Sequence, residues 1–194
     1  MAVDCAPERD ARALLPRTTR ASPSALRFMT GAHLHLLVNH VPILGSFFAL
    51  ALLVASLLYA PDVLRRVALV LLVIVGIAAA AANYTGEPAE DAIRQFPGVL
   101  REVIHEHEEF AELAFYAAVA LGLVSLAALV RWRRETLPHR ASIGLLAGAA
   151  VVSGMMAYTG LLGGQVRHTE VRTDATPADA MTIEPPRVPR PAAP

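Results

Sequence analysis

The hydrophobic pattern of this chain consists of four long uncharged stretches separated by polar segments. The uncharged stretches cover residues 41–60, 67–86, 113–130 and 141–164. Each is close to the ~20 residues that a helix needs to cross ~30 Å of hydrocarbon. Backbone groups inside a bilayer must be hydrogen-bonded within their own segment, so each stretch is predicted to be a helix. With their flanking turns, the predicted spans are about residues 33–60, 64–86, 105–132 and 139–166.

Short connections between these spans favour one simple topology. Residues 61–66 form a tight turn, residues 131–140 a short basic segment, and residues 85–104 a longer acidic one. The pattern predicts an all-α, four-helix transmembrane bundle with up-down-up-down topology over residues 33–171. The flanking residues are polar and irregular, and the last ones are rich in proline and alanine, so both tails are predicted to be disordered: residues 1–32 and 172–194.

Composition places the chain among integral membrane proteins. Of its 194 residues, 55% are hydrophobic, and the formal net charge is zero, which argues against nucleic acid as a partner. The only cysteine, Cys5, has no second cysteine for a disulfide or for covalent haem attachment. A phosphate-binding loop, a dinucleotide fingerprint and a hydrolase triad pattern are all absent from the sequence.

Arginines in the short loops indicate how the bundle is oriented. The loops opposite the N-terminus carry six of them: Arg65, Arg66, Arg131, Arg133, Arg134 and Arg140. By the positive-inside rule these loops are cytoplasmic, although Arg17, Arg20 and Arg27 also precede the first span. We expect a multi-pass protein of the bacterial inner membrane, with its other end outside the cytoplasm.

That other end should collect nearly all the histidines. Four crossings bring six of the seven to one membrane face, namely His33, His35, His40, His105, His107 and His168. Only His139 is expected at the opposite face. Histidine is costly in a bilayer and is the commonest metal ligand among side chains. Their clustering therefore indicates a cofactor or metal site more strongly than any single residue does.

Helical periodicity places small residues in line with two of these histidines. Stepping along the helix from His107 gives Ala111, Ala114, Ala118, Gly122 and Ser125. Stepping back from His168 gives Gly164, Leu161, Ala157, Gly154 and Ala150. Small residues on a membrane helix admit a close neighbour, which is either another helix or a flat macrocycle such as haem.

Two prolines and one carboxylate also shape the expected site. Pro42 lacks an N–H, so the first helix should kink or begin close to His40. Gly86 followed by Pro88 predicts the end of the second helix. Glu112 is the acid nearest the membrane interior, which favours pairing with a basic group or a role in proton movement.

Four motif blocks resemble a bacterial family of four-helix membrane proteins of unknown activity. The first is HLLVNHVPI at residues 35–43, with two histidines five positions apart followed by Pro-Ile. The others are TGEPAE at 85–90, HEEFAE at 107–112 and GGQVRHTE at 163–170. Domains of that family occur fused or adjacent to Rieske-type iron–sulfur modules, so the resemblance implies electron transfer. Its motifs fall on His35, His40, His107 and His168.

These observations lead to three hypotheses. The first is a b-type haem-binding electron-transfer subunit linked to quinol oxidation, with a quinone, membrane lipid and a redox protein as partners. Its expected axial ligands are His40 and His107, with His35 and His168 as a second pair or as supporting groups, and Glu112 handling protons. The second is a zinc, iron or copper site or transporter that uses His40, His107 and carboxylates. The third is a non-catalytic membrane scaffold.

Overall fold

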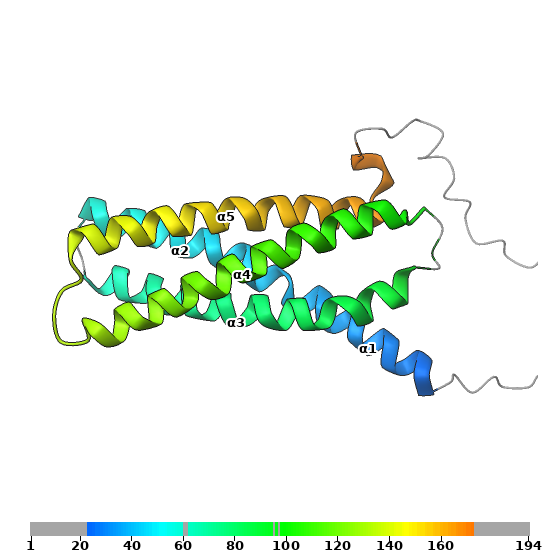
Figure 1. Cartoon of the computed structure of the whole chain (residues 1–194), viewed down its shortest axis with the longest axis horizontal. Helices are drawn as coiled ribbons and strands as arrows, with labels where there is room; N and C mark the ends of the chain where they lie inside the picture. The colour runs from blue at the N-terminus through cyan, green and yellow to red at the C-terminus, as the bar shows by residue number, and fades with distance from the viewer. Residues whose placement is uncertain (1–22, 60–61, 95, 97, 173–194) are drawn as a thin grey trace, which may run out of the picture.

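The computed structural model describes residues 23–59, 62–94, 96 and 98–172, so the predictions for residues 1–22 and 173–194 fall outside it. The helices are α1 (Pro23–Val38), α2 (His40–Tyr59), α3 (Asp62–Ile93), α4 (Arg101–Arg131) and α5 (His139–Arg167), followed by a short 3-10 turn, η2 (Thr169–Val171). Helices α1 and α2 together form the first of four segments long and apolar enough to cross a membrane. The all-α, up-down-up-down bundle is confirmed (Figure 1).

The first span is broken rather than continuous. A turn at Asn39 separates α1 from α2, three residues before Pro42, whose missing N–H leaves the carbonyl of Val38 without a helical partner. This agrees with the kink or restart that was expected near His40. Helix α1 begins at Pro23, earlier than the predicted start at residue 33, and proline suits the first position of a helix because it needs no N–H there.

The prediction that the second span ends at Gly86 is wrong. Helix α3 continues through Gly86 and Pro88 to Ile93. An ideal Cβ on Gly31 would lie 2.7 Å from the Cβ of Pro88, so α1 packs directly on this extension. Arg94 adds ion pairs at the helix end, with its Nη2 2.8 Å from Glu90 and its Nη1 3.5 Å from Asp91. Tertiary packing and local charge pairs thus outweigh the proline.

Helices α3 and α4 touch at their backbones. A Cβ built on Gly76 would lie 3.1 Å from the carbonyl oxygen of Ala118, and one built on Gly122 would lie 3.2 Å from that of Leu72. Only glycine at both positions allows the two helices to approach this closely. Around this contact the bundle is a ring in which α2 packs on α3, α3 on α4, α4 on α5 and α5 on α2.

The interior is made of small and medium side chains, and large apolar ones cover the outside. Residues with almost no exposed surface include Ala49, Leu53, Leu72, Ala149, Ser46 and Ser125. Exposed large apolar residues include Phe48, Leu58, Ile77, Leu123 and Val151. Tight packing of small residues inside an apolar shell is the arrangement expected where lipid, rather than water, surrounds the bundle.

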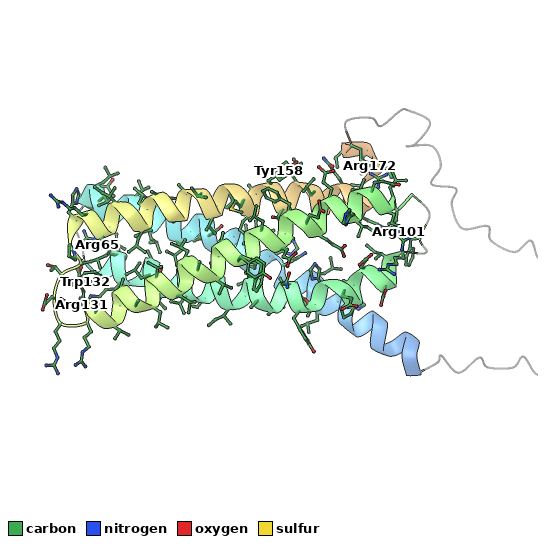
Figure 2. The ribbon with its side chains drawn as sticks, in the orientation of Figure 1. Arg65, Arg101, Arg131, Trp132, Tyr158 and Arg172 are labelled. Atoms are coloured by element: carbon green, nitrogen blue, oxygen red, sulfur yellow. The ribbon has the colours of Figure 1, made fainter. Side chains whose placement is uncertain are left out.

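An arginine cluster joins the two loops at the end opposite the histidines. Arg66 donates to Asp62 at 2.8 Å, to the carbonyl of Trp132 at 3.0 Å and to that of Glu135 at 2.7 Å. Arg65 donates to the carbonyl of Leu137 at 3.4 Å. Arg65 and Trp132 are labelled together at this end in Figure 2. These bonds tie the α4–α5 connection to the start of α3.

Replacing Gly122 with valine should loosen the bundle. The added Cβ would press on backbone atoms, which cannot rotate away, so we expect a loss of about 1–3 kcal/mol of unfolding free energy. Unfolding in mixed micelles measures it. Gly144→Val is the matched control, because no atom lies within 4 Å of a Cβ placed at Gly144. Equal stability of the two variants would contradict the α3–α4 contact.

Candidate functional site

The histidines meet at one end of the bundle, as the sequence predicted. Helix α1, the start of α4 and the end of α5 all lie at that end, and His139 begins α5 at the other (Figure 1). The four crossings of the fold bring this about, because they return the chain to the same face twice. The side chains themselves, however, point in different directions around their helices.

His35 is held in one orientation by helix α3. Its Nδ1 lies 3.1 Å from the carbonyl oxygen of Ala82 and 3.2 Å from the hydroxyl of Thr85. The Thr85 hydroxyl donates its own proton to backbone carbonyls, at 2.9 Å to Ala81. Both neighbours therefore accept, so Nδ1 carries the ring proton and Nε2 keeps a free lone pair. A carbonyl on Nδ1 is the usual arrangement behind a histidine that binds metal through Nε2.

His107 enters the bundle from α4 and lies against α5. A Cβ built on Gly163 would be only 3.1 Å from its Cε1, so the ring rests on glycine backbone. Its Nδ1 is buried and has no hydrogen-bond partner among the described residues. His35 is near enough to His107 to influence it electrostatically. His35 and His107 are therefore the two partly buried histidines at this end of the bundle.

Asn39, which helical periodicity places in line with His35, adds a polar group to this interior. It follows His35 by four residues and so lies on the same face of the first span. Its Oδ1 is buried without a partner in the described part of the chain. Buried polar atoms without partners are rare, and they tend to mark sites that hold a ligand, an ion or water. The spacing from His35 is the sequence signal for Asn39.

The structure does not bring His40 to His107, the pair that was expected as axial ligands. His40 is exposed, and its Nδ1 donates to the carbonyl of Leu36, near the end of α1, at 2.8 Å. His40 begins α2, beyond the turn at Asn39, so it faces outward where His35 of α1 faces inward. His168 and His105 are also exposed, each beside a carboxylate: Glu170 at 2.9 Å and Glu109 at 3.3 Å.

The two faces of small residues do not line a common space. Four members of the α4 face are buried in the bundle, where Gly122 meets Gly76 of α3: Ala114, Ala118, Gly122 and Ser125. The α5 face points out of the bundle, with Gly154, Ala157 and Leu161 exposed. Small residues therefore serve helix packing on α4, and the interpretation of these faces as room for a macrocycle loses its basis.

Acidic groups occupy two separate places. Glu112 is exposed on the outside of α4, where it accepts a hydrogen bond from the Tyr116 hydroxyl at 3.1 Å. Glu90 and Glu108, from the ends of α3 and α4, are joined by a side-chain hydrogen bond. Two carboxyl groups can approach so closely only with a proton or another cation between them. No local sequence pattern predicts this pair, since the two residues are on different helices.

No family model, characterised protein or solved structure matches this chain. The resemblance of the four motif blocks to a family of four-helix membrane proteins therefore stays a prediction, as does the association with Rieske-type modules. The function has to be inferred from the side chains themselves.

The turn after α5 should respond to acid. The pKa of Glu170 lies below its usual value, first because its own backbone N–H donates to the carboxylate and then because His168 does. A depressed pKa means that the bonds to Glu170 stabilise η2 above the ordinary pKa of glutamate and are lost as the pH falls through the lowered value. Carbon-13 NMR of the side-chain carboxyl measures it.

His168→Ala serves as the comparison for that titration. This variant removes the hydrogen bond from His168 and keeps the one from the backbone N–H of Glu170, so the pKa of Glu170 should rise part of the way towards its ordinary value. A Glu170 that titrates normally in the unmodified protein would contradict the geometry of this turn.

Proposed function

We propose that this chain is an integral membrane protein that binds haem b through His35 and His107 and transfers electrons. The observation that carries the proposal is the pair itself. Two partly buried imidazoles, from α1 and α4, lie near enough to influence each other electrostatically at one end of a bundle of four membrane-span-length helices. Facing histidines on separate helices are the usual ligands of a b-type haem in such a bundle.

Two features of the surroundings of His35 and His107 support this proposal. Hydrogen bonds to α3 leave the Nε2 of His35 free to ligate, and His107 has a buried nitrogen without a partner. Both rings lie over glycine, with Gly86 4.0 Å from the Cε1 of His35 and Gly163 3.1 Å from that of His107, measured to ideal Cβ positions. When bound, the haem iron supplies one-electron chemistry, and the protein's part is to fix and orient the two rings.

The ligand count favours haem over a bare ion. Structural and catalytic zinc sites use three or four protein ligands. Among the described residues no group of three histidine, cysteine, aspartate or glutamate side chains is placed to hold a metal. A porphyrin provides four nitrogens itself, so two imidazoles complete its coordination.

Quinol is the proposed electron donor, and Glu112 its proton acceptor. Glu112 lies on the outer surface of α4, close to the boundary of the apolar stretch, where a lipid-soluble quinol can reach it. The Tyr116 hydroxyl holds the carboxylate in place. The arginine-rich loops at the opposite end support a histidine end outside the cytoplasm of a bacterial inner membrane, facing a redox partner there.

Visible spectroscopy tests the haem. The protein, expressed with haem supply and purified in mild detergent, should show a Soret band and a reduced-minus-oxidised difference spectrum. His35→Ala and His107→Ala should abolish both, because each removes an axial ligand. His105→Ala and His139→Ala are the controls, since both histidines are exposed, one at each end.

The possible outcomes separate the three hypotheses. Loss of the spectrum in His40→Ala, with His35→Ala unaffected, would restore the axial pair expected from the sequence. Stoichiometric zinc, iron or copper without porphyrin would indicate a metal-ion site. An absence of both porphyrin and metal from the unmodified protein would overturn the proposal in favour of a scaffold.

Glu112→Gln should slow quinol oxidation. Loss of a positioned proton acceptor typically costs about 10²-fold or more in rate. Stopped-flow reduction of the bound haem by a short-chain quinol measures it, with Glu135→Gln at the other end as control. Unchanged rates with Glu112→Gln would remove this residue from the reaction.

A further inference from the structure

A polar cleft opens where α3 and α4 end. It has a volume of about 410 Å³ and is lined mainly by Glu90, Arg94, Arg101, Glu102, His105 and Glu108. Arg101 is labelled at this end of the bundle in Figure 2. Because α3 and α4 are two of the candidate membrane spans and the cleft lies at their ends, we expect it at the level of lipid headgroups. Its volume suits a small ligand.

One side of the cleft holds two carboxyl groups and is partly enclosed. The Glu90 side chain is 13% exposed and pairs with Arg94 at 2.8 Å. It is also hydrogen-bonded to Glu108 across the gap between the helices. Arg94 pairs with Glu90, and the close approach of the two carboxyl groups requires a proton or another cation between them, so this side of the cleft is suited to a cationic group with several N–H donors.

The other side carries a cation that is available to a ligand. Arg101 is exposed at the first turn of α4, and no carboxylate of the described residues lies within ion-pair distance of it. Its planar guanidinium can bind two phosphate oxygens at once. Carboxyl groups and the Arg101 guanidinium therefore line the same cleft, with Arg101 near enough to Glu90 to influence it electrostatically.

We propose that this cleft binds an ammonium–phosphate zwitterion, as the headgroup of a phosphatidylethanolamine lipid. The primary ammonium donates to Glu90 and Glu108, and the phosphate accepts from Arg101. A choline headgroup has no N–H and cannot replace it, and a glycerol headgroup lacks the positive charge. Free phosphoethanolamine carries the same groups without the acyl chains.

Native mass spectrometry of the full chain in detergent tests the proposal, and it needs no haem. Dioleoyl lipids with ethanolamine, choline or glycerol headgroups are added singly, and soluble phosphoethanolamine separately. We expect ethanolamine lipid to be retained about tenfold more than choline lipid. Glu108→Gln should abolish that preference, whereas Arg101→Gln should weaken retention of every phospholipid. Glu135→Gln, at the opposite end, should change neither.

Each result has one meaning. Equal retention of ethanolamine and choline lipids, or a preference that survives Glu108→Gln, overturns the ammonium contact. Stronger retention of glycerol lipid reduces the site to simple anion binding and also overturns the proposal. Binding of phosphoethanolamine without retention of lipid would mean that the cleft recognises an ammonium–phosphate group of a soluble molecule, and it would overturn the assignment to a lipid headgroup. Arg101 is exposed, so its variant should fold normally.

Discussion

The backbone contact between α3 and α4 determines how the rest of the bundle is arranged. Gly76 and Gly122 let the two helices touch in the middle of their lengths, which fixes their crossing point. From there α4 passes towards α5 at the histidine end, while α3 is covered by α1 (Figure 1). The separation of the two helix ends leaves the cleft around Glu90 and allows His107 to reach the backbone of α5.

The number of predicted spans was enough to place the histidines at one end of the bundle, because the end at which a residue lies depends only on how many times the chain has crossed before it. The direction in which each histidine side chain faces was harder to predict, since it depends on which other helices pack against its own helix. His35 and His40 share a motif, yet they lie on either side of the turn at Asn39, and one is bonded to α3 while the other is exposed. A line of small residues cannot by itself distinguish a packed neighbour from a cofactor, and on α4 the neighbour is α3.

Helix lengths were also only partly predictable. Glycine followed by proline normally ends a helix, and in solution it would be a sound criterion. In this bundle α1 packs over Pro88, and Arg94 pairs with acids one turn back. These contacts stabilise the continued helix α3 by more than the missing hydrogen bond at the proline destabilises it. Contacts between distant parts of the chain, such as Glu90 with Glu108, have no local signature and emerge only from the fold.

The C-terminal end of the bundle is fastened by Arg172. Its guanidinium bonds to the carbonyls of Gln165, Val166 and Gly98, which joins the last turn of α5 to the α3–α4 connection. Since α1 also begins at this end, both ends of the described bundle lie beside the imidazoles (Figure 1). A protein that bound there would meet the histidine end without anything having to pass through the bundle.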